Sequence, residues 1–334
     1  MNNRGTVKAV VLLAAFLVNC ALLFAQDAKV PGGAEKMPLG VEQRNGKMVF
    51  ESKDGSYQWW FDSRIQFDGA MYFENKNPLS NGTLFRRITF ATKAVLGKDW
   101  QAELDLEFSE AVLDLRDVWV QYTIPSVNLS LRAGNFKEPI GMERLNSSRL
   151  LSFLERSSVS SAFPRGRRVG VAARYWTDNG QLTAGIFGHE PGTKIDKGTR
   201  DEGFSANVRA SYAAINEHGK NIHIGAAYAY TIPETTPEFA PNTIELNART
   251  ESYVFDPKFL HTGDISDVNY YNRFGGELMG IYDSFYFQAE YLATTVYRWY
   301  GKSDINVNGG YGMLVYNITG ETRYYYADEG EVGP

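Results

Sequence analysis

The sequence predicts an all-β protein, and more narrowly a transmembrane antiparallel β-barrel. Apolar and polar residues alternate with a period of two in many segments, and the longest exceeds the usual length of strands in globular sheets. Short polar links alternate with long ones, as in outer-membrane barrels. Aromatic residues make up 14% of the chain, and many lie near predicted strand ends, where they suit the two membrane interfaces.

The longest alternating segment is 57–73, YQWWFDSRIQFDGAMYF. Its odd positions are mostly apolar and its even positions include Asp62, Arg64 and Asp68, so a strand here has one apolar and one polar face. Similar alternation marks 100–110, 127–136, 167–176 and 204–212, and also NIHIGAAYAY and SFYFQAEYLATTVY. Counted in this way, the chain has about 13 strand-like segments.

The links between these segments are of two kinds. Short polar links include GKD at 97–99 and TDNG at 177–180. Longer polar links occur at 74–83, 137–166, 190–201, 232–243 and 256–271. This asymmetry favours a membrane barrel. A secreted, soluble all-β protein remains an alternative, although its strands would be shorter and its core face more densely apolar.

The N-terminus predicts export from the cytoplasm. Arg4 and Lys8 precede an apolar run that ends near Phe24, and the small residue Ala25 follows. We therefore predict a signal peptide over 1–25. Attachment of lipid at Cys20 is the alternative, although Asn19 fits that signal poorly.

Two further regions follow the signal peptide. Residues 26–56 are polar, apart from a short MVFES, and are predicted to be a flexible lead-in with at most one short strand. Residues 57–334 form the predicted barrel domain. The polar C-terminal YYYADEGEVGP does not read as a final aromatic strand. This ending predicts that C-terminal strands are missing and that the chain is truncated.

The polar strand faces carry many basic residues. If the apolar faces contact lipid, the basic residues that line the interior are Arg64, Arg87, Lys93, Arg132, Arg168, Arg174 and Arg209. Carboxylates on the same faces are Asp62, Asp68, Glu103, Asp105 and Glu107. Any wide pore needs polar walls, but guanidinium groups match phosphate oxygens, and rings of arginine select anions. The ambiguous register of 84–97 leaves Arg86 at the rim or re-aimed by a bulge.

The long link 137–166 differs from a solvated loop. It carries the cations Lys137, Arg144, Arg149 and Arg156. It also carries apolar residues, namely Ile140, Met142, Leu145, Leu150, Leu151, Phe153, Leu154 and Phe163. A loop folded into a barrel would pack such residues on the wall and narrow the pore. We therefore predict an inward-folded constriction loop that contributes to charge preference.

The sequence contains no recognisable catalytic constellation, and we expect no enzyme activity. Glu103, Asp105 and Glu107 share a strand face and allow a glycosidase as an alternative, but carboxylates in one strand are more typical of a polar wall. The scattered histidines and single cysteine predict no metal site and no cofactor. With a net charge of −5 and widely spaced arginines, no nucleic-acid partner is expected.

Several motifs resemble the phosphate-selective porins of the O and P type. These are LFRRITFATKAVLGKDWQAELDLEF, LRDVWVQYT, YNITGETRYY and, most specifically, the GNFKEP…SSR…FLERS…RRVGV run. The resemblance spans most of residues 57–325. It implies a 16-stranded outer-membrane barrel that forms a homotrimer, with an inward third loop and an arginine-lined anion pathway.

The resemblance also implies particular site residues. Arg86 and Arg87 match the paired arginines near the constriction, and Lys137, Arg144, Arg149 and Arg156 are further candidates. Together with the strand residues, the predicted anion pathway comprises Arg64, Arg86, Arg87, Arg132, Lys137, Arg144, Arg149, Arg156, Arg168, Arg174 and Arg209. The expected function is passive diffusion of phosphate, polyphosphate or other small anions. A general porin, or one for another solute, is the alternative.

Overall fold

The fold is described from a computed structural model, which separates into two units, Met1–Gly40 and Val41–Pro334. The described residues are 40–44, 47–73, 79–191, 202–233, 242–255 and 257–333. The predicted signal peptide, residues 1–25, and the first part of the predicted lead-in lie outside the described residues. Among the described helices, none is long and apolar enough to cross a membrane.

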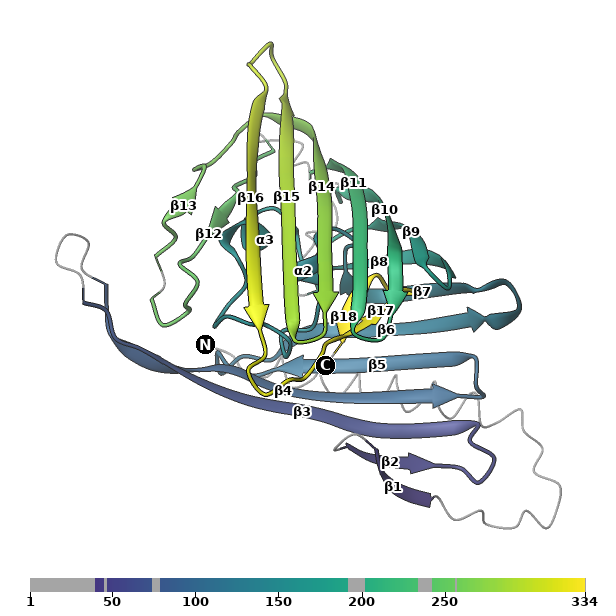
Figure 1. Cartoon of the computed structure of the whole chain (residues 1–334). Helices are drawn as coiled ribbons and strands as arrows, with labels where there is room; N and C mark the ends of the chain where they lie inside the picture. The colour runs from purple at the N-terminus through teal and green to yellow at the C-terminus, as the bar shows by residue number, and fades with distance from the viewer. Residues whose placement is uncertain are drawn as a thin grey trace, which may run out of the picture. The chain divides into compact units, whose positions relative to one another are not determined.

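The described chain is all-β, with one large sheet of 14 strands (Figure 1). Each strand is hydrogen-bonded to the next in sequence, except that β11 pairs with β14, and the order does not close from β16 back to β1 among the described residues. From β2 onward the neighbouring strands of this sheet pair in antiparallel fashion. The strands are β1 Gly40–Arg44, β2 Lys47–Glu51, β3 Tyr57–Ala70, β4 Gly82–Leu96, β5 Trp100–Glu107, β6 Asp114–Ile124, β7 Leu129–Lys137, β8 Arg167–Thr177, β9 Gly180–Phe187, β10 Phe204–Glu217, β11 Lys220–Ile232, β14 Val268–Tyr282, β15 Phe285–Arg298 and β16 Ile305–Tyr316.

The long strands expose their apolar face and turn their polar face inward. On β3, Ile65 is 73% exposed and Phe67 is 60% exposed, whereas the side chain of Asp68 is buried. On β4, Arg87 is buried and Phe90 is exposed. This arrangement reverses that of a soluble sheet, whose apolar face is covered. A contiguous exposed apolar surface marks contact with a partner or a membrane.

Turns of two or three residues join several of the strand pairs. Paired residues flank the turns of the β4–β5, β8–β9, β10–β11 and β14–β15 hairpins, at Leu96↔Trp100, Thr177↔Gly180, Glu217↔Lys220 and Tyr282↔Phe285. The β4–β5 turn has a left-handed backbone at Gly97 and Lys98. The connections at the opposite strand ends are longer, which is the asymmetry typical of outer-membrane barrels.

The described part of the predicted lead-in, residues 40–44 and 47–56, contains two short strands, where the sequence predicted at most one. Both β1 and β2 belong to the large sheet. The ring of Phe50 on β2 contacts Trp59 on β3 at 5.4 Å between centroids, and Val49 pairs with Trp60. The alternation in MVFES is therefore a strand that adds to the sheet edge, because cross-strand ring contacts and ladder hydrogen bonds stabilise it.

The predicted links 232–243 and 256–271 belong to one long connection between β11 and β14. It contains β12 (Asn247–Ala248) and β13 (Leu260–His261), which form a separate two-stranded sheet. Ile244 and Ile265 form a bridge beside them. In Figure 1 this pair of short strands lies apart from the β14–β16 strands. Residues between the two links therefore do not form a strand of the large sheet.

The chain between β7 and β8 lies against the inner face of the sheet (Figure 1). It contains α2 (Met142–Leu145) and α3 (Ser158–Ala162). Ile140 and Met142 are buried, and Met142 packs with Met279 and Tyr286 of the wall strands. Such apolar contacts explain why this segment turns inward.

Not every apolar residue of this segment packs on the wall, so one expectation was wrong. Phe153 is 58% exposed and Leu154 is 44% exposed. Their part of the chain is held by polar contacts: Arg323 donates to Ser152 Oγ at 2.8 Å, and Glu155 receives arginine side chains. The stretch around Glu155 therefore depends on electrostatic contacts more than on burial of apolar surface.

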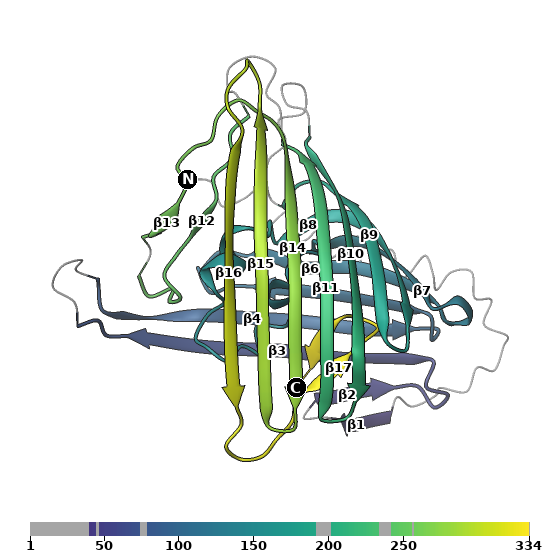
Figure 2. The same ribbon diagram turned by 45° about the horizontal axis from the view of Figure 1, so that its top comes forward.

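The C-terminal stretch, expected to be a polar tail, forms a hairpin of β17 (Tyr324–Tyr326) and β18 (Glu331–Gly333). Val332 belongs to the same apolar cluster as Met142, and its backbone N–H donates to Asn146 Oδ1 at 3.1 Å. Figures 1 and 2 show the hairpin on the same side of the sheet as α2. The wall, the inward segment and the hairpin therefore share one core.

Candidate functional site

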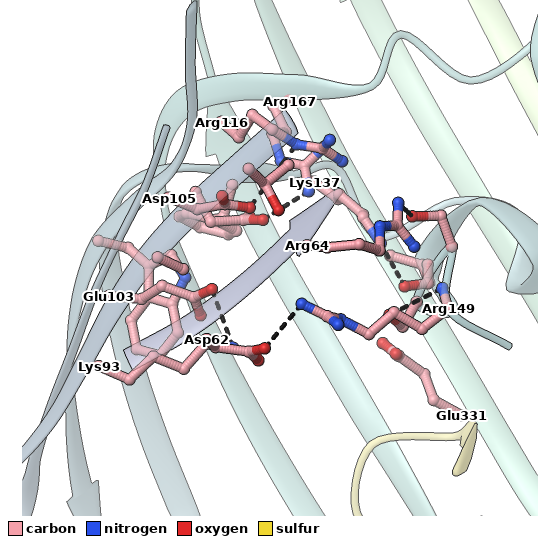
Figure 3. A pocket seen from close by; sticks show the side chains of 18 of the residues that line it. Asp62, Arg64, Lys93, Glu103, Asp105, Arg116, Lys137, Arg149, Arg167 and Glu331 are labelled. Carbon is pink, nitrogen blue, oxygen red and sulfur yellow. Dashed lines mark hydrogen bonds and ion pairs between the residues drawn. The ribbon is translucent and has the colours of Figure 1, made fainter. Parts of the chain in front are cut away.

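A cavity of about 910 Å³ lies on the inner side of the sheet. Strands β3 to β8 form its wall, the inward segment forms another side, and Tyr253 and the C-terminal hairpin complete it (Figure 3). Its basic lining residues are Arg64, Arg86, Arg87, Lys93, Arg116, Arg132, Lys137, Arg144, Arg149, Arg156, Arg167 and Arg174. Its acidic lining residues are Asp62, Glu103, Asp105, Asp117, Glu329 and Glu331. Basic side chains thus outnumber acidic ones two to one, which gives the cavity an excess of positive charge.

Some of the basic side chains are paired with carboxylates. Lys93 Nζ lies 3.0 Å from Glu103 Oε1 and 3.8 Å from an oxygen of Asp62. Arg149 Nη2 lies 2.7 Å from the other oxygen of Asp62. Figure 3 shows these groups meeting along one side of the cavity. The positive charge here is largely compensated.

A second group of ion pairs lies on β5, β6 and β8. Arg116 reaches Asp105 at 3.6 Å and Glu107 at 2.7 Å, and Arg167 reaches Asp117 at 2.5 Å. Oxygens of Glu103, Asp105 and Asp117 lie within 4.8 Å of one another, as the carboxylates of a metal site would. Each of the three already has a basic partner, which neutralises the group. Because these carboxylates are already paired, we interpret them as polar residues of the cavity wall and not as catalytic groups.

Five cavity cations lack any carboxylate partner in the described part of the chain: Arg64, Arg132, Lys137, Arg144 and Arg156. Arg64 donates to Ser148 Oγ at 2.8 Å. Arg132 donates to Gln121 Oε1 at 3.0 and 2.8 Å and lies 4.1 Å from the Trp119 ring centre. Neutral partners satisfy N–H groups without cancelling charge, so these cations keep their attraction for anions.

The remaining three of these cations belong to β7 or the inward segment. Lys137 donates to the carbonyl oxygen of Leu145 at 2.5 Å. Arg156 donates to the carbonyl oxygens of Glu143 and Asn146, both at 2.8 Å. These contacts satisfy carbonyls at the end of α2, where a cation also suits the local dipole. Arg144 has no acceptor among the described residues.

Arg86 and Arg87 converge on one carboxylate, that of Glu155. Arg87 pairs with Gln66 on β3, whereas Arg86 falls in the register shift between Gln66 and Phe67. This bulge re-aims Arg86, which then lies beside its neighbour instead of on the opposite face. Arg86 donates hydrogen bonds to the Glu155 carboxylate from Nε and, at 3.1 Å, from Nη2. Arg87 Nη2 lies 3.1 and 2.9 Å from the two oxygens of the same carboxylate.

The surroundings of this arginine pair are tightly packed. The side chains of Arg86, Arg87 and Glu155 are only 15%, 3% and 5% exposed. The guanidinium of Arg86 also stacks 3.5 Å from the ring centre of Tyr253. The alternating sequence pattern could not reveal Tyr253, because it comes from the connection that carries β12 and β13.

Carboxylates of the wall and loop fix the inward segment. Glu290 on β15 accepts the backbone N–H groups of Met142 and Glu143, the latter at 2.9 Å. Glu138 is buried between Arg165 at 3.2 Å and Arg273 at 2.7 Å. The N-terminus of α2 therefore docks on a wall carboxylate, which the positive end of the helix favours.

Burial and neighbouring charges shift the pKa values of the segment. Burial, followed by the nearby Arg144, lowers the pKa of Arg156 to about 9. Burial and then Arg167 lower the pKa of Arg144. Burial works against ionisation of Glu138, but Arg273 and Arg165 outweigh it and lower that pKa. The loop cations therefore repel one another, and an incoming anion would relieve this repulsion.

Two predicted pathway residues lie outside the cavity. Arg168 lines a smaller cavity of about 220 Å³ and pairs with Glu190. Arg209 is buried against Glu277 at 2.9 Å and donates to the Gly330 carbonyl oxygen at 2.7 Å. The hairpin thus covers Arg209. The other nine predicted residues line the large cavity together.

The site also contains residues that the predicted pathway omitted. Arg116, Arg167 and Lys93 line the cavity, as do Glu329 and Glu331 from the hairpin. Arg116 lies two and four residues before Val118 and Val120, so a strict period of two would have placed it on the apolar face. The register shift of β6 against β5, between Leu104 and Leu106, breaks this alternation next to Arg116. No local pattern indicates that the C-terminal residues return to the interior.

Taken together, an antiparallel sheet with an apolar outer face, an arginine-lined interior and an inward-folded segment defines a porin. Comparison with known proteins agrees: the family model for phosphate-selective porin O and P matches residues 60–334. The chain therefore belongs to the phosphate-selective porin O and P family, which consists of channels.

Two relatives illustrate the relationship. The chain is 23% identical over 319 residues to Porin O of Pseudomonas aeruginosa, an alignment that covers 85% of this chain and 70% of that protein. It is 25% identical over 323 residues to an uncharacterized protein of Caulobacter vibrioides, covering 91% of this chain. The chain spans 62% of the length of this second relative.

Proposed function

We propose that this chain forms an anion-selective channel of the bacterial outer membrane, through which phosphate or polyphosphate diffuses passively. The observation that carries the proposal is the set of five cavity cations without carboxylate partners, Arg64, Arg132, Lys137, Arg144 and Arg156. Cations of this kind raise the local concentration of anions and repel other cations. Membership of a porin family is consistent with passive transport, in which no covalent bond is made or broken.

The types of cation favour oxyanions over simple halides. Guanidinium presents paired N–H donors that match two oxygens of a phosphate, and four of the five unpaired cations are arginines. Carboxylates near them, such as Asp62 and Glu329, keep other arginines extended. A balance of attraction and nearby negative charge allows an anion both to enter and to leave.

The wider setting is part of the same proposal. We propose export by the signal peptide, insertion of the apolar outer face into outer-membrane lipid, and assembly as a homotrimer. No cofactor, metal or nucleic acid is needed for passive diffusion. Chemical crosslinking of the membrane-extracted protein tests the trimer, for which a band of three chain masses is expected and a single-chain band contradicts it.

Planar-bilayer recording tests the selectivity. In a potassium chloride gradient, the reversal potential should have the sign of chloride preference, and added phosphate should reduce the chloride current. A reversal potential with the opposite sign would exclude an anion channel.

A general porin is the second candidate, and the ion pairs of Lys93, Arg116, Arg149 and Arg167 favour it. These pairs neutralise much of the cavity charge, and a fully neutralised wall would conduct small solutes without preference. A reversal potential near zero, with no effect of phosphate on chloride current, would support this candidate over the first.

A further inference from the structure

The contact between Glu155 and the two arginines of β4 has the geometry of a bound anion. Two guanidinium groups surround one carboxylate, and Arg87 Nη2 lies 2.9 and 3.1 Å from its two oxygens. The same donors would suit two oxygens of a phosphate. In the described structure, Glu155, a side chain of the channel itself, therefore occupies the position between Arg86 and Arg87 that an anion could take.

We propose that Glu155 is a tethered competitor that occupies the Arg86–Arg87 pair until an oxyanion displaces it, and so determines which anions bind there. This inference rests on the proposed function and deepens it. A competing carboxylate weakens the binding of every anion, but most strongly that of ions that cannot replace both arginine contacts. Chloride offers one centre, whereas phosphate offers several oxygens and up to two negative charges.

The segment around Glu155 can move away from the arginines more easily than the rest of the inward chain. Phe153 and Leu154, which precede it, are 58% and 44% exposed, so they contribute little packing. By contrast, Ile140 and Met142 at the start of the segment are 2% and 0% exposed. Displacement of Glu155 would therefore break ion pairs and hydrogen bonds without opening a packed apolar core.

The arginines themselves stay in place when Glu155 leaves. Arg87 donates to Gln66 Oε1 at 2.8 Å, and Arg86 stacks on Tyr253. Both contacts are independent of the carboxylate. The pair is therefore a preformed receptor, and the cost of binding falls on displacing Glu155 rather than on ordering the receptor. The return of Glu155 would then help a bound anion to leave, as conduction requires.

The decisive variant is Glu155→Gln, which keeps size and removes the competing charge. In bilayers of the full chain, we titrate inorganic phosphate into chloride and measure the concentration that halves the chloride current. We expect this concentration to fall by about tenfold, the effect of removing one charged competitor of moderate strength. The current carried by phosphate alone at saturation should also fall, because release becomes slower.

Glu329→Gln is the matched comparison. It removes a carboxylate from the same cavity, next to Arg174 at 3.3 Å, but leaves Arg86 and Arg87 paired. If only net cavity charge matters, both variants shift the half-blocking phosphate concentration equally, which would overturn the proposal. We expect the shift for Glu155→Gln to exceed that for Glu329→Gln several-fold.

Glu155→Asp provides a second test should the glutamine variant fail to insert. It keeps the charge but shortens the side chain by one methylene, so it competes less well and should give a shift in the same direction, of smaller size. Unchanged or weaker phosphate binding in the Glu155 variants would refute the competitor. A wild-type chloride current that phosphate does not block would instead refute the proposed function.

Discussion

Two regions of the inner face carry arginines in the same alternating pattern, but they use them differently. Around the large cavity, the acceptors of Arg64 and Arg132 among the described residues are all neutral. Beneath the C-terminal hairpin, Arg209 contacts Glu277 at 2.9 Å, with side-chain exposures of 2% and 0%. The comparison shows that position on the inner face does not decide the role of an arginine. What distinguishes Arg209 from Arg64 and Arg132 is its buried carboxylate partner.

The covered region is a complete network. Glu277 also lies 3.2 Å from His223 Nε2, and the other ring nitrogen of His223 lies 2.6 Å from the hydroxyl of Tyr325 on the hairpin. Its charges compensate each other and its polar atoms find partners, so it stabilises the fold. The cavity region keeps uncompensated cations, which cost stability but can attract a ligand.

Breaking the covered network should have the largest effect on stability. Arg209→Ala leaves the carboxylate of Glu277 buried next to His223 without its arginine. Removing one partner of a buried ion pair typically lowers the free energy of unfolding by about 3–5 kcal/mol. The temperature at which half of the detergent-solubilised protein changes its gel mobility on heating should fall markedly. Replacing both residues, as in Arg209→Met with Glu277→Leu, should restore most of the loss. Full stability of Arg209→Ala would contradict the structural role.

Releasing the inward segment should have the next largest effect. Glu290→Ala removes the acceptor for the N–H groups of Met142 and Glu143, and an unsatisfied buried group costs about 1–3 kcal/mol. We expect faster proteolysis within the segment and a larger single-channel conductance. Glu217→Ala, at an exposed position, is the control. Equal proteolysis of both variants would show that Glu290 does not anchor the segment.

Arg144 and Arg149 contrast an unpaired with a paired cation on the same segment. Arg144→Ala should lower the anion-to-cation permeability ratio by about fivefold, because one nearby charge contributes roughly 1 kcal/mol in a wet environment. Arg149→Ala should lower it less, since Asp62 already compensates that charge. Reversal potentials measure both, and equal effects would contradict the distinction.

Arg156 is less suitable for such a test. Its side chain holds the carbonyls of Glu143 and Asn146. Alanine at this position would therefore disturb the segment as well as remove a charge. Any loss of selectivity would then have two causes.

The smallest expected effect is a pH dependence at the hairpin. Burial, and then repulsion from Glu329, raise the pKa of Glu331 above the usual value of a glutamate. As the pH falls through this raised pKa, Glu331 takes up a proton, the cavity becomes more positive, and anion preference should rise. Because the folded pKa exceeds the unfolded one, protonation also favours the folded hairpin, and this stability declines as the pH rises.

Glu331→Gln tests the origin of this dependence. The variant cannot titrate at this position, so the part of the pH profile above the ordinary carboxyl range should flatten. Reversal potentials recorded across that range would check it. A profile identical to that of the wild type would assign the titration to another group.

The period of two predicted much of the fold. It placed Arg64, Arg87 and Arg132 on the inner face and Ile65 and Phe67 on the outer face, because side-chain direction in a strand follows directly from sequence position. The pattern also predicted that Arg86 would lie at the rim or be re-aimed by a bulge, and the register shift at this position is such a bulge.

The charge partners could not be predicted in the same way. Arg86 and Glu155 are 69 residues apart, and Arg209 and Glu277 are 68 apart. Which carboxylate meets which arginine depends on how the inward segment and the hairpin pack, and neither follows from local alternation. The same limit explains why Arg168 and Arg209 fit the inward pattern yet lie outside the cavity.

One measurement tests the central claim most directly: the reversal potential of a variant with glutamine in place of Arg64, Arg132 and Arg144. Within the described part of the chain, none of the three holds a loop carbonyl or a carboxylate, so the fold should persist. We predict that anion preference is largely lost while conductance remains. An unchanged reversal potential would show that the carboxylate-paired arginines, and not the unpaired ones, set the selectivity.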